Sequence, residues 1–242
     1  MPGSVRQEPA YVLHRRPYRE TSLLVDVFSL NAGRMSVFAR GGNAVKSPLK
    51  AQLQPFQPLL LDWQGRHDLK TLTQTEVQKG PVLQRTDALY CGLYINELLQ
   101  RLLPVGDPSP ELFAAYIDTL DQLATAMDVQ PVLRRFEWAF VDAMGLSFDW
   151  TMTTDTGEAV VPGGHYGYDP EQGIVSDRVS TPRLGGLPGD VLLALSAGDL
   201  ESPACRRLAK KTMRVLIDHL MQGRPLNSRA LFTHGRGDRH ES

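Results

Sequence analysis

The sequence has only two cysteines among its 242 residues. Cys91 and Cys205 are too few for a disulfide framework or a four-cysteine zinc site. Its apolar runs are shorter than the roughly 20 residues that a membrane-spanning helix needs. The first ten residues, MPGSVRQEPA, lack the apolar core of a signal peptide. We therefore expect a protein of the reducing cytoplasm that has no membrane partner.

Groups with catalytic or metal-binding spacing are also scarce. Of the six histidines, none lies three or four residues from a Cys or another His that could share a metal ion. Asp155-Thr-Gly157 resembles the aspartic protease triplet, but those enzymes pair two carboxylates and the triplet occurs once here. Gly145-Leu-Ser-Phe-Asp149 lacks the second glycine of a nucleophile elbow. The sequence thus predicts no catalytic residue, no metal, no cofactor and no enzyme.

The charge is distributed unevenly, although the net charge is only −1. Residues 1–80 hold 11 Lys and Arg against 6 Asp and Glu, and residues 200–242 hold 9 against 4. The middle, residues 81–199, holds 6 against 17. Two basic ends around an acidic middle indicate an anionic partner, or ends that neutralise the middle within the fold.

Residues 10–77 predict a small β-barrel. Short segments, several rich in β-branched and aromatic residues, alternate with turn residues, and closure would remove exposed strand edges. The five segments are residues 10–16, 21–30, 34–40, 53–63 and 69–77. In the third, alternation puts Arg34, Phe38 and Arg40 on one face. This stripe suits a single-stranded nucleic acid, with cations for phosphates and a ring for a base. Alternatively, Phe38 is a core residue and the arginines lie at the barrel ends.

The stretch 38–56 is glycine-rich and contains Lys46-Ser47, as a phosphate-binding loop would. It lacks the glycines of that motif, and Pro48 disfavours helical geometry at Ser47. We therefore expect no helix start here and no nucleotide site. Two interpretations stay open: a hairpin loop with solvated lysines, or a loop that grips a phosphate backbone.

From residue 82 to 145 the pattern becomes helical. One amphipathic helix is expected from Pro110 to Met127, and a second is expected to end at Gly145, with Asp128 and Pro131 between them. Residues 147–186 lose this period and predict an irregular, glycine-rich lobe with short strands at HYGYD and GIVSD.

A last helix is predicted from Ser202-Pro203 to Gly223. Its basic residues recur at the spacing of one helix face; they are Arg207, Lys210, Lys211 and Arg214. Such a face indicates a polyanionic partner, or a solvated face balanced by the acidic middle. The tail, residues 234–242, is expected to be disordered.

Several segments together resemble the RecO family of bacterial recombination mediators. They are VLHRRPYRETSLLVDVFS (12–29), GRMSVFARG (33–41), LKAQLQPFQPLLL (49–61), LYINELLQRLL (93–103), LRRFEWAFVDAMG (133–145) and PLNSRALF (225–232). The resemblance implies an α+β multidomain protein. An N-terminal OB-fold β-barrel, residues 1–80, would precede an α-helical domain, residues 81–242, that contains the irregular lobe at about 147–186.

The resemblance also implies a function in DNA repair and homologous recombination. A member would bind single- and double-stranded DNA and anneal complementary strands without ATP. It would bind the C-terminal tail of single-strand binding protein and help load RecA together with RecR, with RecF as a further functional link. Its location would be the cytoplasm, in association with the nucleoid. The alternative is a protein-interaction scaffold with incidental DNA affinity.

The resemblance assigns roles to particular residues. Arg34, Arg40, Lys46 and Lys50 match positions of the family's DNA-contacting loop and strand, and the stripe with Phe38 points the same way. Tyr18 could stack on a base or pack within its turn.

Arg134 matches the position that grips the tail carboxylate of single-strand binding protein. Alternatively, Arg134 or Arg135 pairs with Glu137 or another acidic residue of the middle segment. The chain departs from the family in one respect. Many members carry a four-cysteine zinc site in the lobe, but residues 146–186 contain no cysteine, which predicts a zinc-free lobe.

Overall fold

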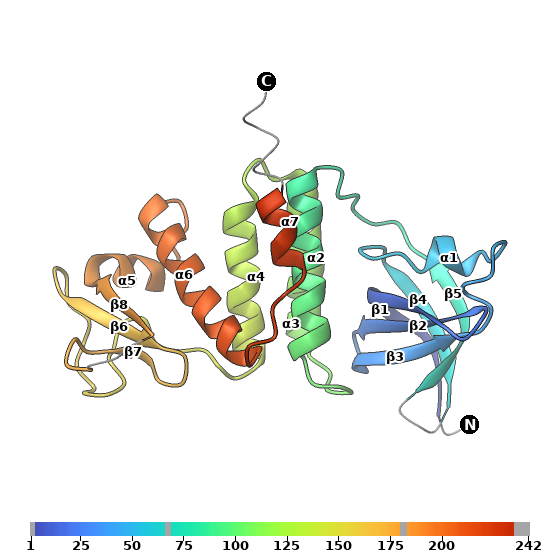
Figure 1. Ribbon diagram of the computed structural model, residues 1–242, viewed down its shortest axis with the longest axis horizontal. Helices are drawn as coiled ribbons and strands as arrows, with labels where there is room; N and C mark the ends of the chain where they lie inside the picture. The colour runs from blue at the N-terminus through green and yellow to red at the C-terminus, as the bar shows by residue number, and fades with distance from the viewer. Residues whose placement is uncertain (1–2, 66–68, 180–182, 235–242) are drawn as a thin grey trace. The chain divides into compact units, whose positions relative to one another are not determined.

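The computed structural model describes residues 3–65, 69–179 and 183–234. Contacts divide the chain into two units, whose elements are labelled in Figure 1. The first unit runs to Val129 and takes up the chain again from Leu226, whereas the second holds Gln130–Pro225. The first unit extends past the expected boundary at residue 80, because helices pack against the barrel.

A closed five-stranded barrel forms the N-terminal part of the first unit (Figure 1). Its strands are β1 (Ser4–Tyr18), β2 (Ser22–Ser29), β3 (Gly33–Ala39), β4 (Leu59–Gln64) and β5 (Lys70–Val77). They close in the order β1-β2-β3-β5-β4, with β3 and β5 parallel and the other pairs antiparallel. The predicted OB-type barrel is confirmed.

The barrel interior is apolar, as the alternation in β3 predicts. Met35, Val37 and Ala39 are buried inside, among valines and leucines of the other strands and Trp63. Phe38 lies on the opposite, outer face and is only half-buried, so the alternative that made it a core residue was wrong.

A short helix, α1 (Leu49–Gln52), lies between β3 and β4. Pro48 is its N-cap with φ −64° and ψ −28°, so the expectation that no helix starts here was wrong. Proline is compatible with a helix start because the first N–H groups of a helix have no partner within it. Arg15 holds this segment to β1, since its Nη1 donates to the carbonyls of Lys50 (2.7 Å) and Leu53 (3.1 Å).

Helices α2 (Thr86–Leu102), α3 (Pro110–Thr125) and α7 (Ser228–His234) complete the first unit. Pro110 is the first residue of α3, as predicted. The apolar stripe of that helix does not reach Met127, which is 91% exposed, because α3 ends at Thr125.

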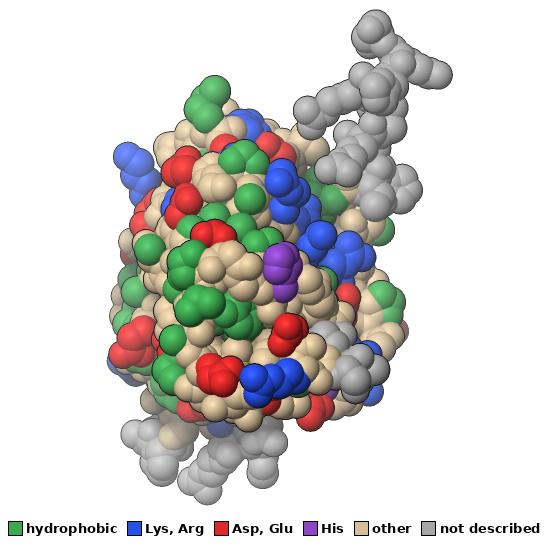
Figure 2. All heavy atoms as spheres, turned by 90° about the vertical axis from the view of Figure 1, so that its left-hand side faces the viewer, with side chains coloured by type: hydrophobic (Ala, Val, Ile, Leu, Met, Phe, Trp, Pro, Cys, Tyr) green, Lys and Arg blue, Asp and Glu red, His purple; other side chains and the backbone are tan. Residues whose placement is uncertain are grey.

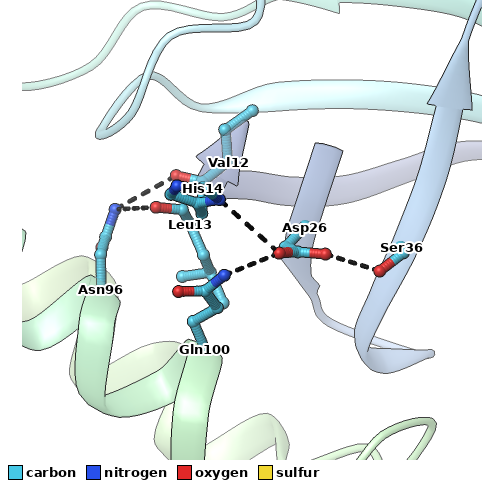
Figure 3. Close-up of polar contacts among 7 residues, drawn as sticks. All are labelled: Val12, Leu13, His14, Asp26, Ser36, Asn96 and Gln100. Carbon is cyan, nitrogen blue, oxygen red and sulfur yellow. Dashed lines mark hydrogen bonds and ion pairs between the residues drawn. The ribbon is translucent and has the colours of Figure 1, made fainter. Parts of the chain in front are cut away.

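Helix α2 packs on an irregular part of β1 (Figure 3). The register between β1 and β2 shifts between Val12 and His14, so the strand bulges there. The Asn96 amide of α2 donates to the carbonyls of Val12 (3.2 Å) and Leu13 (3.3 Å). Its oxygen accepts the hydroxyl of Tyr116 at 2.8 Å. This buried side chain therefore supplies a donor to the bulge and is itself satisfied.

A carboxylate of α2 binds the N-terminal end of α7 and so holds the two helices together. Glu97 accepts the backbone N–H groups of Asn227 (2.9 Å) and Ser228 (2.8 Å) and the Ser228 hydroxyl (2.6 Å). Arg101 lies 2.9 Å from the same carboxylate. Burial by itself would raise the pKa of Glu97, but the bonds from Ser228 and Asn227, with Arg101, hold it below its ordinary value.

The second unit combines helices with a three-stranded sheet of order β7-β6-β8. Its elements are α4 (Val129–Ala143), β6 (His165–Asp169), β7 (Gly173–Val175), β8 (Leu184–Pro188), α5 (Gly189–Ser196) and α6 (Pro203–Leu220). The strands at HYGYD and GIVSD and the last helix are confirmed, whereas β8 and α5 were not predicted. Pro131 lies in the first turn of α4 and does not separate two helices. Throughout the described ranges, none of the helices is long and apolar enough to span a membrane.

We expect Asn96→Ala to destabilise the protein by about 1–3 kcal/mol, because it removes a buried donor to the two bulge carbonyls and a buried acceptor from the Tyr116 hydroxyl. Urea unfolding of both proteins measures the difference. Gln74→Ala, on an exposed position of β5, is the control and should change stability by less than about 0.5 kcal/mol. An Asn96 variant as stable as that control would contradict the anchoring role.

We expect the docking of α7 to weaken in acid. The pKa of Glu97 is lowered in the folded state, so its contribution is present above the unfolded value of about 4.3 and is lost as pH falls through the folded value. Hydrogen-exchange protection of the α7 amides, compared at pH 7 and pH 3, measures this. In Glu97→Gln, most of the difference in α7 protection between pH 7 and pH 3 should be lost. Equal wild-type protection at both would refute the linkage.

Candidate nucleic-acid interface

Helices α2 and α3 cover one end of the outer face of β1, β2 and β3. There, Tyr11 and Phe28 pack their rings against Phe113 and Tyr116 of α3, at centroid distances of 5.1 to 6.1 Å. This end of the face is therefore covered by a helix of the same unit.

A polar row marks the limit of the covered end (Figure 3). His14, Asp26 and Ser36 lie side by side on the three strands. Asp26 accepts the Ser36 hydroxyl at 2.5 Å and the Gln100 amide of α2 at 2.8 Å. The His14 imidazole lies 3.9 Å from the same carboxylate and is half exposed. Helix α2 thus contacts this row through Gln100 at Asp26.

Beyond this row the face is basic and aromatic. Arg16 of β1 and Phe38 of β3 flank Leu24 of β2 in the next row. Arg16 is exposed, whereas Leu24 and Phe38 are half-buried. Tyr18 follows two residues after Arg16 and meets Phe38 edge to face, with centroids 5.6 Å apart and planes at 80°. Aromatic rings that stay partly exposed beside cations can stack on bases while the cations bind phosphates.

The turn between β1 and β2 adds another cation. Arg19 is exposed, and its guanidinium lies over the Tyr18 ring at 5.4 Å from the centroid. Its backbone has φ 55°, in the left-handed region. The connection from β3 to β4 lies beside this turn, because the Asn43 N–H donates to the Thr21 carbonyl at 2.8 Å.

That connection carries three of the predicted cations. Arg40, Lys46 and Lys50 are all exposed. Together with the aromatic rows they form a surface that we call the barrel's basic surface; its residues are Arg16, Tyr18, Arg19, Phe38, Arg40, Lys46 and Lys50. Phe38 and Arg40 lie at the same end of β3, and Lys46 and Lys50 lie on the connection that follows it, and their role in DNA binding stays a prediction.

The fifth predicted residue, Arg34, lies elsewhere. Its position pairs with Phe28, at the covered end of the face, and its Nε donates to the Leu103 carbonyl at 2.6 Å. Its own carbonyl accepts the Gly106 N–H at 2.8 Å. Burial lowers the pKa of Arg34, and Asp26 partly opposes this. The side chain joins the barrel to the segment after α2 through its Nε, and its role as a DNA contact stays a prediction.

Two segments of the chain approach each other closely at this junction, at Gly33 and Asp107. Gly33 has φ 65°, and a Cβ there would lie 2.2 Å from the Asp107 carbonyl oxygen. Only glycine permits both the conformation and the approach. The segment after α2 is thereby fixed against the start of β3.

The second unit carries the other predicted basic face. Arg207, Lys210, Lys211 and Arg214 of α6 are exposed, opposite the buried stripe of that helix. Arg214 lies 3.9 Å from Asp218, one turn further on. Figure 2 shows the left-hand side of Figure 1, on which Lys and Arg side chains stand among Asp and Glu side chains. The predicted exposed face is confirmed, but its role as a DNA site stays a prediction.

Arg134 is buried in α4, and its Nη1 lies 2.6 Å from Glu137, which is also buried. The ion pair that the sequence left open as an alternative is therefore present. The Nε of Arg134 is buried and has no hydrogen-bond partner among the described residues. Arg135, the next residue, is exposed.

The aspartate of the Asp155-Thr-Gly157 triplet has a structural role. Asp155 accepts the hydroxyl of Ser176 at 2.6 Å and its N–H at 2.9 Å. The Ser176 hydroxyl is the main reason that the pKa of Asp155 is lowered. This carboxylate closes a turn of the lobe onto the residue after β7. Within the described part of the chain, no three His, Cys, Asp or Glu side chains lie close enough to hold a metal ion.

Sequence reasoning missed Arg16 and Arg19 as members of the basic surface. A signal was present, because both lie in the RRPYRET segment that precedes the first turn. Arg16 lies two residues before Tyr18, so strand alternation predicts that both lie on one face of β1. The left-handed backbone of Arg19 had no such signal. The predicted disordered tail was to begin at His234, but this residue still belongs to α7; residues 235–242 lie outside the described residues.

Comparisons with known proteins cover nearly the whole chain. A family model described as the N-terminal part of recombination protein O matches residues 4–81, and one for its C-terminal part matches residues 83–229. The chain is 62% identical to "DNA repair protein RecO" of Marinobacter nauticus over 97% of its length and 96% of the relative. The same name is carried by a Nitrosospira multiformis relative at 43% identity over 94% and 95%, and by a Methylococcus capsulatus relative at 41% over 96% and 94%.

We expect Arg134→Ala to destabilise the second unit by about 3–5 kcal/mol, because it removes the cation of a buried ion pair. The double variant Arg134→Met, Glu137→Leu should be far closer to wild type, since it removes both charges. Thermal and urea unfolding compare the two. Arg135→Ala, exposed on the same helix, serves as the control. Equal losses in the single and double variants would contradict this interpretation of the ion pair.

Proposed function

This chain belongs to the recombination protein O family, and we propose that it is a non-enzymatic mediator of DNA repair and homologous recombination. In this role it binds single- and double-stranded DNA and anneals complementary strands without ATP. It acts in the cytoplasm, in association with the nucleoid.

The observation that carries the proposal is the barrel's basic surface. The edge-to-face pair of Tyr18 and Phe38 offers rings to bases, and the flanking cations offer partners to phosphates. The covered end of the same face limits the strand to the half beyond Asp26. A strand bound here would run past the turn at Arg19 toward Lys46 and Lys50.

Annealing follows from charge neutralisation. Two strands repel each other through their phosphates, and cations that hold both reduce this repulsion. The basic face of α6 is the second surface that we propose for this purpose, since its four exposed cations lie on one side of one helix. No reaction step is needed beyond base pairing of the strands.

The partners in the proposal are proteins of the same process. They are the C-terminal tail of single-strand binding protein, RecR, RecA and, as a functional link, RecF. We propose that the tail carboxylate binds at Arg134, whose buried Nε is a donor without an acceptor among the described residues. Because Glu137 already balances the charge of Arg134, the tail would have to share this arginine or displace Glu137.

We expect the reversal Arg40→Glu, Lys46→Glu, Lys50→Glu to weaken single-strand binding by at least about tenfold at moderate salt. The log–log salt slope should become shallower by about 2, at roughly 0.7 for each of three phosphate contacts. Anisotropy titrations of a labelled oligonucleotide at several salt concentrations measure both. The matched control reverses Lys79, Arg178 and Arg183, three exposed cations outside both proposed surfaces, and should bind with nearly wild-type affinity. A wild-type affinity that does not depend on salt would sink the DNA-binding proposal.

The tail proposal needs a variant that folds, and the double variant Arg134→Met, Glu137→Leu provides one. We expect it to anneal bare strands normally. On strands coated with single-strand binding protein it should lose the advantage that the acidic tail gives to the wild type. If it keeps that advantage, Arg134 is not the tail site. If the wild type anneals neither bare nor coated strands, a scaffold function is favoured instead.

A further inference from the structure

The turn between β1 and β2 holds a backbone conformation that is unfavourable for its residue. Arg19 has φ 55°, a region in which side chains other than glycine are strained. A glycine here would relieve that strain. The arginine side chain is thus held at this turn in spite of an unfavourable backbone conformation.

The side chain of Arg19 already has a partner. Its guanidinium carbon lies 5.4 Å from the centroid of Tyr18, over the ring, while Tyr18 also meets Phe38 edge to face. Arg19 thus covers part of the ring that the proposed function offers to a base. Since Arg19 is exposed and Tyr18 is half-buried, this cover can move away without disturbing the barrel core.

We propose that Tyr18 and Arg19 form an exchange site for one nucleotide of a single strand. A base takes the place of the guanidinium on the Tyr18 ring, and the freed guanidinium pairs with a neighbouring phosphate. This inference rests on the proposed function and adds to it the residue that opens the stacking site. No covalent bond is made or broken, and Arg19 keeps its positive charge throughout.

The balance of the contacts favours the exchange. An exposed cation–π contact changes an equilibrium constant by about 2- to 5-fold. A base stacked on an aromatic side chain contributes about 5- to 150-fold, and the phosphate contact adds to it. The ring is therefore covered in the free protein and is given up when a strand binds.

The first experiment compares Arg19→Gly with Gln7→Gly in the full chain. Gln7 is also exposed and has φ 53°, but it is uncharged and lies in β1 near Asp62, to which its N–H donates. Both substitutions relieve the same backbone conformation, so both should raise Tm or leave it unchanged. Arg19→Gly alone should weaken binding of oligo(dT) and make the salt slope shallower by about 0.7.

The second experiment separates exchange from a simple phosphate contact. In the wild type, Arg19 must leave the ring before it binds a phosphate, whereas in Tyr18→Leu it has no ring to leave. Arg19→Gly should therefore cost about 2- to 5-fold more affinity in the Tyr18→Leu background than in the wild type. Each variant is checked by its Tm, so a misfolded protein is not counted.

Three results would overturn the exchange site. They are an Arg19→Gly protein that binds as tightly as Gln7→Gly, equal costs of Arg19→Gly in both backgrounds, and a smaller cost in Tyr18→Leu. Equal costs would make Arg19 a phosphate contact alone, and a smaller cost would mean that it stays on the ring in the complex. In each case salt-dependent binding by the wild type would survive, so this failure differs from failure of the proposed function.

Discussion

The contact between Asn96 and the bulge of β1 determines which part of the barrel surface is free. The bulge exposes the carbonyls of Val12 and Leu13, and the amide of Asn96 bonds both. Tyr116 fixes the other end of that amide, so α2 and α3 are held to the same point. The helices consequently cover the face up to Asp26, and the same face beyond it stays open.

The two halves of this face use similar residues for different purposes. At the covered end, Tyr11 is packed against α3, and burial, followed by the charge of Asp121, raises the pKa of Tyr11 to about 12. At the open end, Tyr18 and Phe38 contact each other and stay half-buried beside arginines. An aromatic ring with neighbouring cations and no covering helix is a stacking surface, whereas the covered rings only stabilise the unit.

Local patterns in the sequence predicted much of this arrangement. Alternation in β3 correctly separated the buried Val37 from the outward Phe38, and the helical period placed the cations of α6 on an exposed face. The resemblance to the RecO family predicted the OB-type barrel followed by a helical domain. These successes concern features that depend on neighbours within a few residues.

Long-range partners could not be predicted in the same way. The contact of Arg34 with the Leu103 carbonyl joins residues 69 positions apart, and no local pattern distinguishes it from Arg40. The strand β8 and the helix α5 were missed because a glycine-rich segment gives no clear period. For Arg134 the sequence left two partners open, and only the packing of α4 showed that Glu137 lies beside it.

The most direct test of the account is photo-crosslinking of the full chain to a single strand that carries 5-iodouracil, followed by mapping of the attached peptides. The account predicts crosslinks at Tyr18 or Phe38, whose rings react with the photoactivated base, and none at Tyr11 or Phe28. Crosslinks confined to α6, or to the helix-covered end of the barrel face, would contradict it.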